Sequence, residues 1–281
     1  MDQIRFVGIS SCVKDAAFKL PEIVSRIQVR IPLNVLLSRP VTGFIHAGLN
    51  PEIGLNALDL TLNFSDRIGA AAQQFRKAGR RITLHAPFAD LAAGSSDPAI
   101  RTVTRHRFAQ MLRLLPALSP ETVVCHTGYD WRRHGHYRRQ WFENSLETWI
   151  WLATQIRDFG SRLMLENVYE QNPEELRALL ETLAPWGVGF CLDTGHQAAF
   201  SDATMDQWLD ALLPCLGQVH IHDNRGRRDE HLAPGCGHID FKHLFHRLAI
   251  QNRPPTITLE INSESDLPAS LEYLDGIWPW S

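Results

Sequence analysis

The chain alternates short apolar runs with longer segments of helical periodicity, and this alternation limits the possible folds more than any other sequence feature. The apolar runs are short and rich in β-formers, so they predict buried strands. We expect strands over residues 4–10, 57–64, 82–86, 122–126, 162–166, 188–192, 219–222 and 256–261. Helices are expected over residues 16–28, 65–79, 98–115, 141–160, 172–183, 205–213, 241–249 and 268–274.

Strands that alternate with helices favour parallel pairing through right-handed crossovers. The length of 281 residues suits a single (β/α)8 TIM barrel that spans residues 1–281. An open doubly wound sheet is the alternative. Polar residues follow nearly every strand rather than one or two switch points, which favours the barrel. Residues 30–55 stay unassigned, because prolines and glycines interrupt any regular pattern there.

Composition narrows the functional classes. A net charge of −3 does not indicate a protein that coats nucleic acid. The five cysteines are scattered and form no CxxC pair, which argues against a disulfide framework or a cysteine zinc knuckle. With no recognisable leader, the sequence predicts a cytoplasmic protein. Apolar runs are interrupted well before membrane-spanning length, so we expect no membrane contact.

Histidines and acidic residues gather at the predicted strand ends. Residues 219–237, VHIHDNRGRRDEHLAPGCG, contain several of them. In a barrel all these ends meet on one face. Any one of these residues could be a hydrogen-bonded structural residue, but imidazole and carboxylate groups are also the usual ligands of zinc and related ions. The set comprises His85, His126, Glu166, Asp193, His196, His220, His222, Asp229, His231 and Glu260.

The motifs at these positions resemble one protein superfamily. They are LHAPF (84–88), VVCHTG (123–128), LMLENV (163–168), CLDTGH (191–196), VHIHDN (219–224), DEHLAPGCG (229–237) and LEIN (259–262). Together they are similar to the xylose isomerase-like TIM barrels, which include sugar isomerases and epimerases and the DNA-repair enzyme endonuclease IV. HAPFADL, GYDWRRH, LENVYE and FCLDTGH further resemble a branch that cuts the nucleotide loop of cobamides.

The resemblance implies two ligand sets. In the isomerases and epimerases one ion has four ligands, which correspond here to Glu166, Asp193, His220 and Glu260. The two glutamates would also carry protons to and from carbon. Endonuclease IV binds three ions, and its ligand positions correspond here to His85, His126, Glu166, Asp193, His196, His220, Asp229, His231 and Glu260. His222 falls on a non-ligand position, so we expect it to support a ligand or contact the substrate.

The larger set favours a metal-dependent phosphodiester hydrolase with two or three ions, and zinc is favoured over manganese. Clustered arginines would bind a small phosphate-containing substrate, or else pair with surface acids. Duplex DNA is less favoured, because no intercalating element is recognised. A sugar isomerase or epimerase with a single ion is the alternative, and a non-catalytic binding barrel is a third hypothesis. The oligomeric state stays open. The arginines proposed for substrate are Arg132, Arg133 and Arg225.

Overall fold

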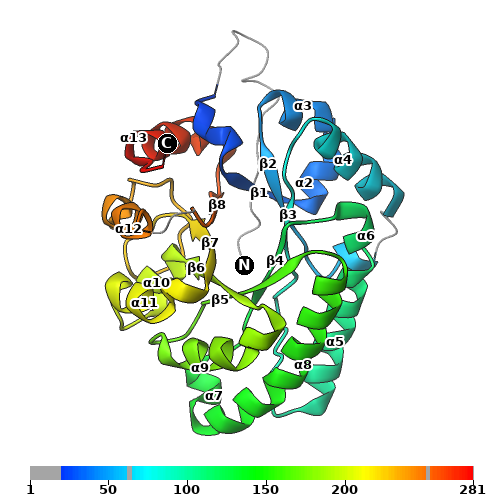
Figure 1. Ribbon diagram of the computed structural model, residues 1–281, viewed down its shortest axis with the longest axis vertical. Coiled ribbons are helices and arrows are strands. Elements are labelled where there is room, and N and C mark those ends of the chain that lie inside the picture. The colour runs from blue at the N-terminus through cyan, green and yellow to red at the C-terminus, as the bar shows by residue number, and fades with distance from the viewer. Residues whose placement is uncertain (1–19, 62–64, 251–253, 281) are drawn as a thin grey trace.

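Eight parallel strands close into a barrel in chain order (Figure 1). The structure is a computed structural model that describes residues 20–61, 65–250 and 254–280. β1 pairs with β2 and with β8, which closes the barrel. The predicted (β/α)8 barrel is confirmed. Its strands are β1 (Gln28–Pro32), β2 (Asn50–Gly54), β3 (Thr83–His85), β4 (Thr122–His126), β5 (Arg162–Glu166), β6 (Gly189–Asp193), β7 (Leu216–Ile221) and β8 (Thr256–Leu259).

Helices surround the barrel, and those expected from residue 65 onward are present (Figure 1). α5 begins where Pro98 follows Asp97, whose side chain accepts a hydrogen bond from the Ala99 N–H. None of the described helices is long and apolar enough to cross a membrane. The helices are α2 (Leu33–Ser38), α3 (Val41–His46), α4 (Ser65–Lys77), α5 (Pro98–Leu112), α6 (Leu115–Leu118), α7 (Trp131–His134), α8 (Arg138–Asp158), α9 (Glu174–Leu183), α10 (Thr194–Phe200), α11 (Met205–Leu212), α12 (Phe241–Leu248) and α13 (Leu267–Ile277).

The first two barrel strands lie elsewhere than expected, because they are β1 and β2 of the stretch that had no assignment. The predicted strand 4–10 lies outside the described residues, and the predicted helix 16–28 contains, in its described part, a short 3-10 helix (Glu22–Ser25) and the first residue of β1. The predicted strand 57–64 instead begins with a turn, in which Asn56 Oδ1 accepts from the N–H groups of Leu58 and Asp59. The real β1 and β2 contain Pro32 and Pro51 and several buried polar residues, which hid them from a search for apolar runs.

Alternate residues along the strands have different surroundings. On β5, the outward-facing Leu163 and Leu165 belong to the main core, with Trp149 and Ile156 of α8. On the inner face, Val124, Met164 and Cys191 form a small separate cluster two residues before the last residues of β4, β5 and β6. Because side chains alternate along a strand, the terminal polar residues share this inner face and stand above an apolar layer.

The loops after β4 and β5 are joined by a buried glutamate. Glu170 is 2% exposed, and its Oε1 accepts a hydrogen bond of 2.5 Å from the Thr127 hydroxyl. Its Oε2 accepts a hydrogen bond of 2.7 Å from the Val168 N–H. Burial raises the pKa of the Glu170 carboxyl to about 7.

This raised pKa predicts a pH-dependent stability. Between the unfolded pKa and about 7, the folded chain holds a proton that the unfolded chain has lost, so the unfolding free energy should fall as pH rises, by about 1–3 kcal/mol. Glu170→Gln should remove this loss, and Glu174→Gln, at an exposed acid of α9, should not. The unfolding free energies can be measured by denaturant unfolding at about pH 5 and pH 8. If the unfolding free energies of Glu170→Gln and wild type differ by the same amount at both pH values, the prediction is contradicted.

Candidate metal centre

The predicted strand-end residues converge at one end of the barrel. Strands β3 to β6 end on His85, His126, Glu166 and Asp193, and His220 lies near the end of β7. The remaining residues lie just beyond the strands: Glu260 after β8, His222 after β7, His196 in the first turn of α10, and Asp229 and His231 in the loop after β7. All nine predicted ligands occur in groups whose donor atoms lie within 4.8 Å of one another.

Glu166 lies at the centre of the cluster. Its Oε2 is 3.2 Å from His85 Nε2 and 3.5 Å from His126 Nε2. Its Oε1 is 3.3 Å from His196 Nδ1 and 3.5 Å from His220 Nδ1. Because each oxygen faces the ring nitrogens of two histidines, this carboxylate could contribute to the binding of more than one ion.

Glu260 connects the cluster to β1. One nitrogen of the Arg30 guanidinium, Nη1, lies 2.9 and 2.8 Å from the two Glu260 oxygens. Glu260 Oε1 also lies 3.1 Å from His220 Nδ1. The Glu260 carboxylate is therefore held between a cation and an imidazole.

A second group lies in the loop after β7. Asp229 Oδ2 is 3.1 Å from His231 Nε2 and 3.4 Å from His196 Nε2. The buried His222 ring stacks on His231 with centroids 3.9 Å apart, and its Nε2 lies 3.0 Å from Asp193 Oδ1. His231 has a φ of 48°, a left-handed conformation that is strained for a residue with a side chain. The fold thus accepts strain where it places this imidazole beside Asp229.

Gly195 makes room for His222. A Cβ on Gly195 would lie 1.9 Å from the His222 ring, so no larger residue fits without moving that imidazole. The glycine of the CLDTGH motif therefore has a packing role at the site.

Three imidazoles are oriented as metal ligands usually are. Nδ1 of His85, His196 and His231 lies 2.9, 3.0 and 3.2 Å from backbone carbonyl oxygens. A carbonyl can only accept, so these nitrogens carry the proton and leave each Nε2 lone pair directed into the cluster.

Several buried nitrogen and oxygen atoms of the cluster, each of a kind that can bind a metal, lack a hydrogen-bond partner. Among the described residues these include His220 Nδ1, His222 Nδ1 and Asp229 Oδ1. Glu166, Asp193 and Glu260 are at most 2% exposed, and burying so many carboxylates is costly without cations. Orphaned nitrogen and oxygen atoms beside buried acids fit one or more divalent ions.

The pKa values reflect these contacts. Burial alone would raise the pKa of the Glu166 carboxyl, but His126 and His220 outweigh it and hold this pKa well below its usual range. Burial lowers the pKa of His126 to about 3, so this imidazole is neutral at neutral pH. Burial alone would also lower the pKa of His196, but Asp193 raises it well above its usual value. Protons therefore occupy part of the cluster when no metal competes.

Two residues of the site were missed in the sequence. Arg30 and Glu52 lie opposite each other on β1 and β2, within the stretch that had no assignment. Glu52 is fully buried, and its Oε1 lies 3.1 Å from His220 Nε2. The signal was a glutamate in the otherwise uncharged run LNPEIGL, the same kind of signal that identified Glu166 and Glu260.

Cys191 also lies within reach of Glu166 and His220. Burial raises the pKa of its thiol, so it stays protonated and is a poor metal ligand. The thiol is better described as part of the apolar layer under the site.

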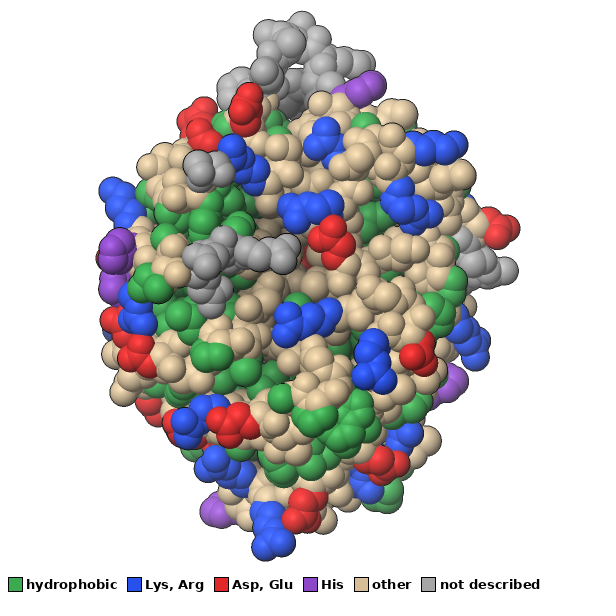
Figure 2. Space-filling model, in the orientation of Figure 1, with side chains coloured by type: hydrophobic (Ala, Val, Ile, Leu, Met, Phe, Trp, Pro, Cys, Tyr) green, Lys and Arg blue, Asp and Glu red, His purple; other side chains and the backbone are tan. Residues whose placement is uncertain are grey.

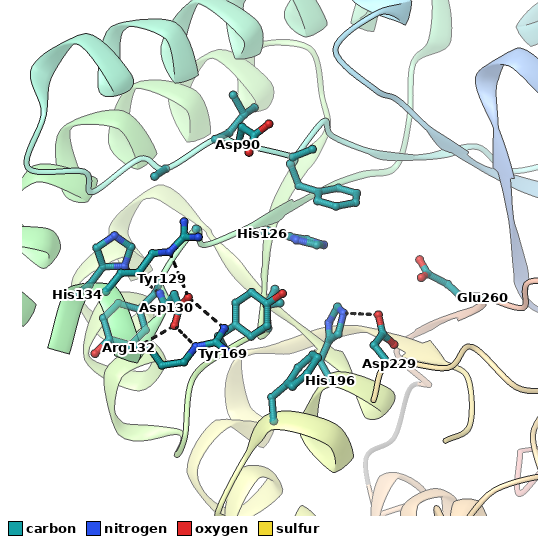
Figure 3. A pocket seen from close by; sticks show the side chains of 18 of the residues that line it. Asp90, His126, Tyr129, Asp130, Arg132, His134, Tyr169, His196, Asp229 and Glu260 are labelled. Atoms are coloured by element: carbon teal, nitrogen blue, oxygen red, sulfur yellow. Dashed lines mark hydrogen bonds and ion pairs between the residues drawn. The ribbon is translucent and has the colours of Figure 1, made fainter. Parts of the chain in front are cut away.

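A cavity of about 800 Å³ opens over the cluster. Figure 3 shows His126, His196, Asp229 and Glu260 at one end of it and Tyr129, Asp130, Arg132 and His134 at the other, with Tyr169 between them. His222 is not among the residues that line this cavity, so its place is behind the ligands. A substrate that filled the cavity would extend from the metal cluster to the segment after β4.

Residues 131–141, which follow β4 and contain Arg132 and Arg133, are helical: they form α7, a short 3-10 helix and the start of α8. Arg132 and Arg133 line the cavity, and both pair with Asp130, Arg132 at 2.9 Å. Arg225 pairs with Glu230 at 2.6 Å and is not among the lining residues. Pairing with acids was the alternative explanation of these arginines, and their contact with substrate stays a prediction.

Basic side chains are not gathered in one field on the face shown in Figure 2, where acidic side chains lie among them. This distribution does not favour a duplex-binding surface on the part of that face that is drawn in colour.

A family model for the xylose isomerase-like TIM barrel matches residues 52–277. The chain belongs to this family. The match begins at Glu52 and includes every predicted ligand. The superfamily resemblance in the motifs is thus confirmed, whereas the cobamide branch stays a prediction.

Sequence relatives are distant. The protein MJ1311 of Methanocaldococcus jannaschii is 28% identical over 200 residues, which cover 69% of this chain and 68% of that one. The protein y4fM of Sinorhizobium fredii is 24% identical over 244 residues, 78% of this chain and 77% of that one.

Solved structures share the fold. The TTHB071 protein of Thermus thermophilus, soaked with ZnCl2, has a TM-score of 0.72 and 27% identity and covers 89% of this chain and 98% of its own. A D-tagatose 3-epimerase-like protein has a TM-score of 0.73 and 21% identity, and the match covers 89% of this chain and 97% of that one. The 3-keto-D-glucoside 4-epimerase YcjR of E. coli has a TM-score of 0.68 and 16% identity, and the match covers 89% of this chain and 99% of that one.

Protons and metal should compete for this site. His196 and His231 have raised pKa values in their acidic surroundings, where Asp193 acts chiefly on His196 and Asp229 on His231, and metal binding needs their neutral forms. Zinc affinity should therefore rise with pH, about tenfold per unit for each proton displaced. Calorimetry in buffers of different ionisation enthalpy measures both the affinity and the released protons. Affinity that is constant between about pH 6 and 8 would contradict this.

Proposed function

We propose that this protein is a metal-dependent hydrolase of a phosphodiester in a small sugar-phosphate-containing substrate. The observation that carries the proposal is the second group of ligand residues, since Asp229 and His231 lie beside His196 rather than apart from the cluster. A single-ion enzyme has no need of this group. When bound, two or three divalent ions would activate water and offset charge on the phosphate and the leaving oxygen.

The residues present can hold more than one ion. His85, His126 and Glu166 form one group, and Glu166, Asp193 and His196 form another that shares Glu166. Another group brings together Asp229 and His231, with the His222 ring packed behind them. Neutral imidazoles mixed with carboxylates favour zinc, with manganese as the alternative.

The cavity supports a phosphate-containing substrate larger than a monosaccharide. Its volume of about 800 Å³ lies towards the upper end of the range for small-molecule sites. Arg30 lines the cavity beside Glu260 and brings a guanidinium next to the metal cluster, where a phosphate oxygen would be bound. The nucleotide loop of a cobamide stays a prediction for the substrate.

A sugar isomerase or epimerase is the second candidate. Two of the solved neighbours are named as an epimerase or as epimerase-like. The four residues expected for a single-ion site, Glu166, Asp193, His220 and Glu260, are clustered here. In that chemistry Glu260 would have to take a proton from carbon. Arg30 is bound to both Glu260 oxygens, and a carboxylate stabilised in this way is a weak base.

Metal counting combined with a substrate panel separates the two candidates. The wild-type protein should hold two or three ions per chain by elemental analysis and should cleave bis(p-nitrophenyl) phosphate. Asp229→Asn should lose at least one ion and about 100-fold of this activity. His243→Gln is a matched control, because that histidine pairs with Asp206 on the outside of α12 and α11.

The opposite result would support the epimerase. One ion per chain, unchanged in Asp229→Asn, would overturn the hydrolase. Interconversion of D-tagatose or another ketose by both the wild-type protein and this variant would establish the second candidate in its place.

A further inference from the structure

Glu52 has no role in the ligand sets, yet it lies directly under them. It is fully buried on the inner face of β2. Its Oε2 accepts hydrogen bonds of 3.0 Å from both Thr83 Oγ1 and Thr258 Oγ1, and another from Gln218 Nε2. Its Oε1 has no hydrogen-bond partner. A fully buried carboxylate with one satisfied oxygen and one orphaned oxygen requires an explanation.

The orphaned oxygen faces one side of the His220 ring. Glu52 Oε1 is 3.1 Å from His220 Nε2. On the other side of the ring, His220 Nδ1 is also without a hydrogen-bond partner and lies 3.1 Å from Glu260 and 3.5 Å from Glu166. The His220 ring therefore has an orphaned oxygen next to its Nε2 and an orphaned nitrogen, its own Nδ1, on the opposite edge.

A metal on Nδ1 accounts for both orphaned atoms. Metal binding uses the Nδ1 lone pair, so the proton of the neutral ring must be on Nε2. That proton then needs an acceptor inside the barrel. Gln218 Nε2, 3.2 Å from His220 Nε2, is a donor and cannot accept it, whereas Glu52 Oε1 can.

We infer that Glu52 is a positioning residue that fixes His220 as an Nδ1 metal ligand by accepting its Nε2 proton. This assignment rests on the metal site of the proposed function but not on the reaction that the site performs. It also explains the reversed orientation of His220, because His85, His196 and His231 have their Nδ1 on backbone carbonyls and direct Nε2 inward.

The variant Glu52→Gln tests the inference sharply. At the Oε2 position the Gln218 amide nitrogen can only donate and both threonine hydroxyls can donate, so the amide oxygen should lie there and the amide NH2 should face His220. A donor against Nε2 favours the form of the ring that carries its proton on Nδ1. In that form Nδ1 has no free lone pair for a metal. Zinc affinity, measured by competition with a chelator, should fall by about 100-fold, the upper end of the range for residues that support a ligand.

Thr258→Val is the matched control. It removes one hydrogen bond to the same carboxylate but leaves the acceptor for the His220 proton in place. Thermal unfolding should show destabilisation in both variants, while zinc affinity should fall in Glu52→Gln and stay close to wild type in Thr258→Val.

Nuclear magnetic resonance with ¹⁵N-labelled histidine gives a readout independent of activity. In the zinc-loaded wild-type protein, His220 should carry its proton on Nε2, and this measurement decides the matter even if Glu52→Gln fails to fold. Wild-type zinc affinity in Glu52→Gln, or zinc on His220 Nε2, would overturn the inference. Zinc binding without phosphodiesterase activity would contradict only the proposed function, whereas a wild-type protein that binds no zinc would overturn both.

Discussion

The burial of several carboxylates among imidazoles at one end of the barrel is the interaction on which the rest of the site depends. Glu166, Asp193 and Glu260 are almost completely enclosed, and such groups are stable inside a protein only when opposite charges or ligands surround them. The described structure provides the imidazoles and Arg30. It also leaves ring nitrogen and carboxylate oxygen atoms without hydrogen-bond partners, and divalent ions would bind these atoms.

The barrel supports this cluster from below and from the side. Val124, Met164 and Cys191 form an apolar layer under the strand ends, so the polar residues have little freedom to turn inward. β1 and β2 add Arg30 against Glu260 and Glu52 against His220. Ligands from the later strands thus depend on supports from the first two, as metal ligands generally depend on the groups behind them.

The loop after β7 carries the proposed distinction between the two chemistries. Its aspartate and histidine, Asp229 and His231, extend the cluster towards the open cavity, and His231 adopts a strained backbone conformation there. Strain of this kind persists only where surrounding contacts enforce it, and it is typical of functional sites. An enzyme that moves a proton between carbons on one ion has no use for this extension, whereas an enzyme that stabilises charge on phosphorus does.

The sequence by itself determined the alternation of strands and helices and with it the barrel, while the nine candidate ligands came from the resemblance of its strand-end motifs to endonuclease IV. Strand-end residues such as His126 and Glu166 are recognisable because an acid or imidazole at the end of an apolar run is unusual. Only the tertiary structure revealed β1 and β2, since their prolines and inward polar residues imitate a loop. It alone showed that Glu52 faces His220 and that Arg225 pairs with Glu230, because such contacts depend on which side chains the closed barrel brings together.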